Sequence, residues 1–121
     1  MRKIFVTGIG TDVGKTVVSA ILTEALEADY WKPIQAGDLD NSDSIKVQNL
    51  ISNEKTVIHP EGKKLTSAMS PHAAAEVDKV EIKLSDFMLP ETDNILVIEG
   101  AGGLMVPLND IDLIIDLIQK L

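Results

Sequence analysis

The residues with the clearest chemical potential lie in the stretch VTGIGTDVGKTVVS, at positions 6–19. The GKT at residues 14–16 has the form of a phosphate-binding loop, in which amides surround the phosphates, the lysine adds charge and the hydroxyl coordinates Mg²⁺. The usual pattern also places a glycine five residues before this GKT. The chain has Ile9 there, between Gly8 and Gly10. These residues predict a nucleotide phosphate site whose first glycine is displaced by one position; a glycine-rich turn without a ligand is the alternative.

A carboxylate at the end of an apolar segment is the second signal. Glu99 follows the apolar run at 95–98 and opens the glycine-rich EGAGG. Ligands of α/β sheets bind at the carboxyl ends of parallel strands, and Mg²⁺ prefers oxygen ligands. We therefore expect Glu99 to serve an Mg–nucleotide site beside the phosphate loop, although a glutamate at a tight turn could have no such role.

Three other polar residues give weaker signals. Lys32, in WKPIQAG, falls near the end of a second apolar segment and could stabilise a developing oxyanion, whereas lone lysines at strand ends are usually solvated. Asp43, in NSDS, falls near a helix start, where it could be only a cap or a partner of the helix dipole. His72, in SPHAAAE, is more typical of a solvated residue near a helix start.

Apolar patterns along the chain predict the strands and helices that must position these residues. Short apolar runs predict strands, and helical spacing or capping residues predict helices. The predicted strands are 3–7, which we expect to be buried, 29–34 and 94–100; the predicted helices are 15–28, 41–52, a short one from 70 and 110–121. Asn41 or Ser42 is the expected cap of the second helix, and residues 53–69 are predicted to be loop. This alternation indicates an α/β fold with a parallel sheet.

Length and charge restrict the class of protein. The 121 residues suit one small domain, and a net charge of −8 argues against nucleic acid or an anionic membrane as the main partner. The chain has no cysteine, which excludes disulfides and thiolate metal sites. The first residues, MRKIFVTG, do not have the pattern expected of a signal peptide, and no apolar run approaches about 20 residues, so we expect a soluble cytoplasmic protein. With three convincing strands and a helix at its end, residues 1–121 are expected to form a single domain that is incomplete at its C-terminus.

Taken together, the motifs resemble those of the dethiobiotin synthetase family. That family has a loop of the form GTxTxVGKT, which is similar to GIGTDVGKT at residues 8–16. It also has KP, NSD, SPH and EGAGG, which appear here in the same order at 32–33, 41–43, 70–72 and 99–103. The displaced first glycine is a feature of the family itself.

The resemblance implies a three-layer P-loop NTPase-like fold with a parallel central sheet, here its N-terminal part. It also implies an ATP-dependent cyclo-ligase of biotin biosynthesis, which carboxylates 7,8-diaminononanoate with CO₂ and closes it to dethiobiotin. A carbamate attacks the γ-phosphate to give a carbamic–phosphoric anhydride, and ring closure then releases phosphate beside ADP. The implied cofactor is Mg²⁺, ATP is a substrate, and the implied assembly is a homodimer.

Residue roles follow from the same resemblance. Lys32, Lys15 and Thr11 match the family's catalytic residues, and Thr16, Asp43 and Glu99 match its Mg²⁺ ligands. The implied nucleotide-binding residues are Asp12, Val13, Gly14, Lys15, Thr16, Val17, Asp43, Glu99, Gly100, Ala101 and Gly102.

Two substitutions depart from the family's pattern. Ala36 stands where a Ser or Thr is usual near the substrate, and the missing hydroxyl removes one hydrogen bond of about 0.5–1.5 kcal/mol. Asp12 stands where Glu is common.

Three other functions stay open. Partitioning switch ATPases usually carry an extra lysine early in the loop, where this chain has Ile9 and Gly10. Cobyrinic acid amidating synthetases share an EG at the strand end but usually need a glutaminase domain with a cysteine nucleophile, and this chain has no cysteine. A non-catalytic phosphate-binding fragment is the third alternative.

Overall fold

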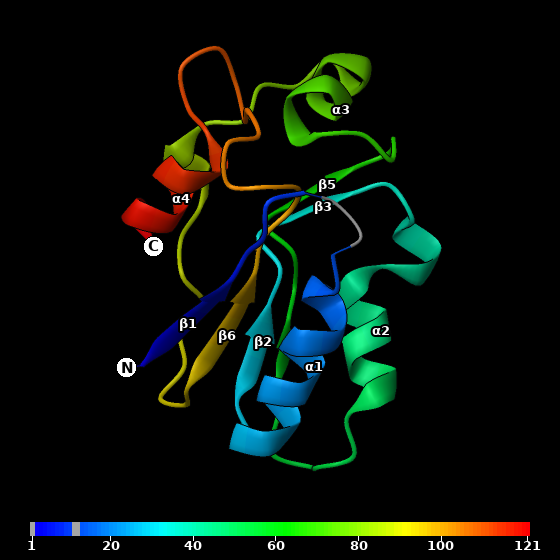
Figure 1. Ribbon diagram of the computed structural model, residues 1–121, viewed down its shortest axis with the longest axis vertical. Helices are drawn as coiled ribbons and strands as arrows, with labels where there is room; N and C mark the ends of the chain where they lie inside the picture. Colours follow the sequence, from blue (N-terminus) through cyan, green and yellow to red (C-terminus); the bar gives the residue numbers. More distant parts are fainter. Residues whose placement is uncertain (1, 11–12) are drawn as a thin grey trace.

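The computed structural model describes residues 2–10 and 13–121 as alternating strands and helices (Figure 1). The strands are β1 (Lys3–Val6), β2 (Asp29–Trp31), β3 (Ile34–Ala36), β4 (Ile58–His59), β5 (Lys63–Leu65) and β6 (Leu96–Glu99). The helices are α1 (Lys15–Leu26), α2 (Asp43–Leu50), α3 (Pro71–Asp78) and α4 (Ile114–Lys120), with 3₁₀ turns at Leu39–Asn41 and Leu84–Asp86. Of the helices in the described part of the chain, none has the length and apolar character to cross a membrane.

Parallel strands form two sheets. The larger sheet has the order β1-β6-β2-β4, and β3 pairs with β5 in the smaller one. Each pairing of named strands is parallel. The predicted α/β class with a parallel central sheet is therefore confirmed.

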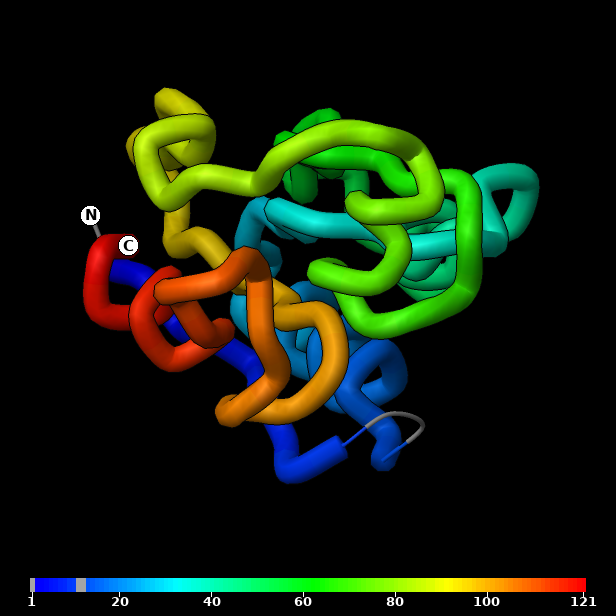
Figure 2. The backbone as a smooth tube through the Cα atoms, turned by 90° about the horizontal axis from the view of Figure 1, so that it is seen from above, coloured from blue at the N-terminus to red at the C-terminus, as the bar shows by residue number. Residues whose placement is uncertain are grey.

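Helices and loops cover the larger sheet on both sides, which gives three layers. On one side, α1 and α2 bury Tyr30 and Val97; on the other side, α4 and the segment around Phe87 bury Trp31 and Ile98. Neighbouring residues of a strand point to opposite faces, so β2 supplies one aromatic side chain to each core. Figure 2 shows the end of α4 beside β1, where the Lys3 ammonium contacts the Leu121 carbonyl.

Four strands differ from the sequence prediction. Residues 53–69 are not all loop, because they contain β4 and β5. These strands have only two and three residues, too few for a hydrophobic period, and pairing with β2 and β3 stabilises them. The predicted strand 29–34 is two strands in different sheets, since Pro33 has no amide hydrogen with which to continue the ladder.

Helical periodicity located α1 but did not identify its buried face. The buried residues include Ser19 and Thr23, whereas Val17 and Ile21 are 57% and 60% exposed. The small buried side chains allow a close approach of α1 to the sheet. The expectation that the first strand is buried is also wrong: β1 is an edge strand of this sheet, and only Val6 in it is buried.

Asp29, the first residue of β2, has a buried carboxylate that forms several hydrogen bonds at the amino-terminal end of the larger sheet. The Asp29 carboxylate accepts hydrogen bonds from Thr92 Oγ1 at 2.7 Å, the Val57 amide at 3.1 Å and Asn94 Nδ2 at 3.2 Å, and lies 2.9 Å from His59 Nε2. Burial alone would raise the pKa of Asp29. The hydrogen bonds from Thr92, His59 and the others outweigh burial, so the pKa is below its usual value.

Replacement of Asp29 with asparagine is expected to lower the free energy of unfolding at pH 7 by about 1–3 kcal/mol. Because the folded-state pKa of Asp29 is depressed, the ionised group stabilises the fold above its unfolded-state pKa of about 3.9. That contribution is lost as the pH falls through the folded-state pKa. In urea unfolding, the difference between wild type and Asp29→Asn should therefore shrink at acid pH. A difference that does not change with pH would contradict this role.

Candidate functional site

The strand order brings the predicted site residues to one edge of the larger sheet. β6 lies between β1 and β2, with Val6 paired to Glu99 and Trp31 paired to Ile98. Lys32 follows Trp31 directly, so the register places it beside Glu99. The phosphate loop follows β1 at the same edge.

The phosphate loop leads directly into α1. Gly14 has φ of 99° and precedes the first helical residue, and its carbonyl accepts a hydrogen bond from the Val18 amide at 3.1 Å. This positive φ requires glycine. Lys15 Nζ donates to the Gly10 carbonyl at 2.7 Å. The predicted site residues Thr11 and Asp12 lie outside the residues that the structure describes.

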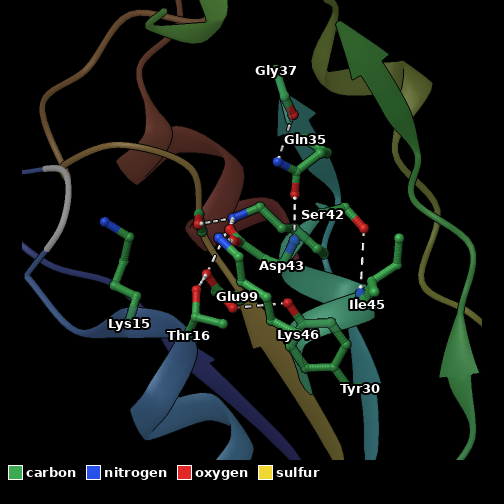
Figure 3. Close-up of polar contacts among 12 residues, drawn as sticks. Lys15, Thr16, Tyr30, Gln35, Gly37, Ser42, Asp43, Ile45, Lys46 and Glu99 are labelled. Atoms are coloured by element: carbon green, nitrogen blue, oxygen red, sulfur yellow. Dashed lines mark hydrogen bonds and ion pairs between the residues drawn. The ribbon is translucent and has the colours of Figure 1, made fainter. Parts of the chain in front are cut away.

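Glu99 is the centre of a buried hydrogen-bond network. Its side chain is 1% exposed and extends between Thr16 and Tyr30 (Figure 3). Tyr30 OH donates to Glu99 Oε1 at 2.8 Å, and Thr16 Oγ1 donates to Glu99 Oε2 at 2.9 Å. The glutamate is therefore not merely part of a tight turn.

Lys32 connects the two acidic residues of the site. Lys32 Nζ lies 2.6 Å from Asp43 Oδ2 and 3.2 Å from Glu99 Oε2, and it donates to the Gly100 carbonyl at 3.0 Å. The lysine is 3% exposed, so the solvated alternative does not hold. Three oxygen acceptors satisfy the three donors of its ammonium group.

Burial and the Lys32 charge have different net effects on the two carboxylates. Burial raises the pKa of Glu99 above its usual value, against the attraction of Lys32. For Asp43, burial is again the largest cause and acts to raise the pKa, but the charge and hydrogen bond of Lys32, with smaller contributions from Glu99 and Lys46, together outweigh it, so the pKa is lowered. Burial, followed by the charge of Glu99, raises the pKa of Tyr30, so its phenol remains a hydrogen-bond donor at neutral pH.

Gln35 and Ser42 hold the start of α2. Gln35 Oε1 accepts a hydrogen bond from the Asp43 amide at 3.1 Å, and Gln35 Nε2 donates to the Gly37 carbonyl at 2.9 Å. Ser42 Oγ accepts from the Ile45 amide at 3.3 Å, which confirms a cap at this helix and assigns it to Ser42. Because Ser42 supplies the cap, the Asp43 side chain extends to Lys32.

Lys32, Gln35, Asp43 and Glu99 border a cavity of about 870 Å³. The predicted site residues that line it are Gly14, Lys15, Thr16, Val17, Lys32, Asp43, Glu99, Ala101 and Gly102. Val13 and Gly100 are not among its lining residues, although the Gly100 carbonyl contacts Lys32. His72 borders a different cavity, with Nε2 at 3.4 Å from Glu76 Oε1 and 3.3 Å from Asp110 Oδ1.

Comparison with known proteins decides the family. A family described as "AAA domain" matches residues 2–121. The chain belongs to this AAA domain family. It is also similar to proteins named ATP-dependent dethiobiotin synthetase BioD, as the sequence motifs indicated.

Three relatives of this AAA domain show the extent of that similarity. The protein from Christiangramia forsetii is 60% identical over 119 residues, which are 98% of this chain and 58% of the relative. The one from Cytophaga hutchinsonii is 56% identical over 121 residues, 99% of the chain and 58% of the relative. The one from Paramagnetospirillum magneticum is 50% identical over 121 residues, 100% of the chain and 58% of the relative. The chain thus spans 58% of the length of these curated relatives.

Two site residues of this AAA domain were missed in the sequence. Tyr30 and Gln35 hold Glu99 and the start of α2, and both are buried. Each lies within three residues of Lys32, but a tyrosine in an apolar strand resembles any core residue. For Gln35, the one available signal in the sequence was its polar character within the segment WKPIQAG.

Gly103 brings the loop after β6 against the phosphate loop. A Cβ added at Gly103 would lie 2.7 Å from the Ile9 carbonyl oxygen and 3.1 Å from the Gly10 nitrogen. The Leu104 amide donates to the Gly8 carbonyl at 3.0 Å in the same contact. A side chain at position 103 must therefore push the two loops apart.

We expect Gly103→Ala to weaken binding of a fluorescent ATP analogue roughly tenfold, since small displacements of positioning groups have effects of this order or larger. Fluorescence titration measures the affinity, and thermal unfolding of the same samples is the control. Unchanged affinity in a folded variant would show that the spacing of these loops is unimportant for nucleotide binding.

Proposed function

We propose that this protein is an ATP-dependent dethiobiotin synthetase, which carboxylates 7,8-diaminononanoate with CO₂ and closes the product to a cyclic urea. One observation carries the proposal beyond the names of the relatives. The ammonium group of Lys32 is buried between Asp43 and Glu99, next to the Thr16 hydroxyl of the phosphate loop. Phosphoryl transfer needs such a concentration of positioned charges rather than an activated serine or cysteine.

The proposed reaction has three steps. One amine of the substrate captures CO₂ as a carbamate, whose oxygen attacks the γ-phosphorus of ATP and displaces ADP. The second amine then attacks the carbonyl carbon of the mixed anhydride, and the carbon–oxygen bond to phosphate breaks. Lys32 would stabilise negative charge on the carbamate and the transferring phosphoryl group. Lys15 would hold the terminal phosphates, and Thr11 would contact the carbamate or the γ-phosphate.

The residues fit Mg²⁺ by the chemistry of their donors. The carboxylates of Asp43 and Glu99 both contact the Lys32 ammonium group, and the Thr16 hydroxyl donates to Glu99, so the three side chains gather oxygen atoms of the kind that Mg²⁺ prefers as ligands. We assign the cation to these three residues; when bound, it would neutralise charge on the β- and γ-phosphates. The other nucleotide contacts that we propose are Asp12, Val13, Gly14, Val17, Gly100, Ala101 and Gly102.

The substrate side of the site contains the alanine that departs from the family's pattern. Ala36 lines the cavity and ends β3, three residues beyond Pro33. We propose that the diamine binds here without the hydroxyl that relatives usually supply. A cytoplasmic homodimer is the proposed working form.

Phosphate release tests this function. The protein is incubated with ATP, Mg²⁺ and bicarbonate, with and without 7,8-diaminononanoate. We expect release only with the diamine, together with a cyclic urea product found by mass spectrometry. Release that does not depend on the diamine would favour another ATPase of the P-loop group. Nucleotide binding without any release would favour a non-catalytic phosphate-binding function.

A further inference from the structure

Tyr30 forms a contact with the site from outside the cavity. It is the one tyrosine of the sequence and is 0% exposed. Its ring packs in the core that α1 and α2 cover, and its hydroxyl donates to Glu99 Oε1 at 2.8 Å. A hydroxyl in such an apolar setting needs a partner, and a charged acceptor makes the hydrogen bond stronger.

The two oxygens of Glu99 have different partners. Oε1 accepts the Tyr30 hydrogen bond, whereas Oε2 accepts from Thr16 Oγ1 at 2.9 Å and lies 3.2 Å from Lys32 Nζ. Thr16 and Lys32 line the cavity, and Tyr30 does not. The phenol therefore fixes the rotation of the carboxylate, with Oε2 on the side of the phosphate loop (Figure 3).

β2 and β6, the strands that carry Tyr30 and Glu99, are paired with each other in the larger sheet. Tyr30 is paired with Val97 in the register between β2 and β6, and Glu99 is the last residue of β6. Tyr30, Val97 and Glu99 lie on the same face of the sheet because side chains alternate along a strand. The tyrosine thus reaches Glu99 from a fixed backbone position, as a well-ordered supporting group must.

We propose that Tyr30 is a positioning residue, which holds Glu99 so that Oε2 alone is presented to a divalent cation. This inference rests on the proposed function, in which Glu99 is a cation ligand. Tyr30 acts through Glu99 and contacts neither nucleotide nor substrate. Groups that orient the ligands of a metal typically change its affinity about 10–100-fold when they are removed.

Mn²⁺ binding to Tyr30→Phe tests the role directly. With the slowly hydrolysed analogue ATPγS present, titration of Mn²⁺ followed by electron paramagnetic resonance should give a dissociation constant about 10–100-fold higher than in wild type. Affinity for ATPγS without metal should not change. Trp31→Phe is the matched control: like Tyr30→Phe it removes a hydrogen-bond donor from a buried aromatic residue of β2, but this donor is the indole N–H, which bonds to the Pro60 carbonyl at 3.0 Å. Equal Mn²⁺ affinity in wild type and in folded Tyr30→Phe would overturn the inference and leave the proposed function intact.

The single tyrosine also allows a spectroscopic test that needs no substitution at position 30. Protein labelled with ¹³Cζ-tyrosine gives one Tyr30 resonance, which reports the hydrogen bond of the phenol. We expect it to shift in Glu99→Gln, whose neutral acceptor is weaker, and to keep its wild-type position when Mg²⁺ and ATPγS bind. Movement of the wild-type resonance to the Glu99→Gln position on binding would show that Tyr30 releases the carboxylate, which overturns the inference. Failure of the wild type to bind Mn²⁺ with ATPγS would instead overturn the proposed cation role of Glu99, and this inference with it.

Discussion

Replacement of Lys32 with methionine is expected to lower the free energy of unfolding at pH 7 by about 3–5 kcal/mol. The ammonium group contacts Asp43 Oδ2 at 2.6 Å and Glu99 Oε2 at 3.2 Å, and the Glu99 side chain is 1% exposed. Methionine preserves most of the side-chain volume but leaves these carboxylates without their cation. An unpaired buried charge costs more than the intact pair contributes, which is the reason for the large effect.

Two variants separate this effect from a general loss of charge. Lys46→Met removes a lysine that is 43% exposed and lies 3.8 Å from Asp43 Oδ1, so urea unfolding should show a loss below about 1 kcal/mol. The double variant Lys32→Met/Glu99→Gln removes the more deeply buried of the unpaired carboxylates and should recover part of the stability. A Lys32→Met variant no less stable than Lys46→Met would contradict the proposed ionic network.

The same substitution should also reduce diamine-dependent phosphate release by about 10²–10³-fold, the usual cost of removing a group that stabilises developing charge. The rate is to be measured at a temperature where Lys32→Met remains folded. Near-normal turnover in the folded variant would remove Lys32 from the proposed mechanism.

Lys15→Gln is expected to lower phosphate release by about 10²–10³-fold or more. Lys15 lies in the first turn of α1 and lines the cavity, with Nζ 2.7 Å from the Gly10 carbonyl. Glutamine keeps the helix but removes the charge that the phosphate loop directs to the terminal phosphates. Binding of a fluorescent ATP analogue and phosphate release should both fall.

Lys83→Gln is the control for this change, because Lys83 is 61% exposed and lies outside the cavity. Lys83→Gln removes the same charge and is expected to change neither measurement. Unaltered turnover in Lys15→Gln would show that residues 14–16 are not a phosphate site.

Much of the site was predictable because it depends on local order along the chain. A strand that ends at a glycine loop and leads into a helix locates Lys15 and Thr16, and an apolar strand that ends in Glu99 points to the same sheet edge. Parallel pairing then brings these ends together without further information. Asp43 and Lys32 required the family's motifs, since a helix start and a strand end have many ordinary uses.

The parts of the fold and site that the sequence did not predict depend on contacts between residues that are far apart in the sequence. β4 and β5 exist because they pair with β2 and β3, and no periodicity within two or three residues could predict them. Tyr30 and Glu99 are 69 residues apart, so neither residue alone indicates the hydrogen bond that joins them. The buried face of α1 was unpredictable for a related reason: helical spacing places residues on faces, but the sheet determines which face is covered.

Pro33 has a consequence for how the two sheets behave. β2, in the larger sheet, ends at Trp31, and β3, in the smaller sheet, begins at Ile34. Lys32 therefore lies at the junction between the two sheets. Its ammonium group contacts residues that follow β6 and begin α2, as well as Glu99 itself. A ligand bound at this junction would contact both sheets and would stabilise, by mass action, the folded state in which the two sheets are packed together. Binding would thus make the two sheets open together, as one cooperative unit, rather than independently.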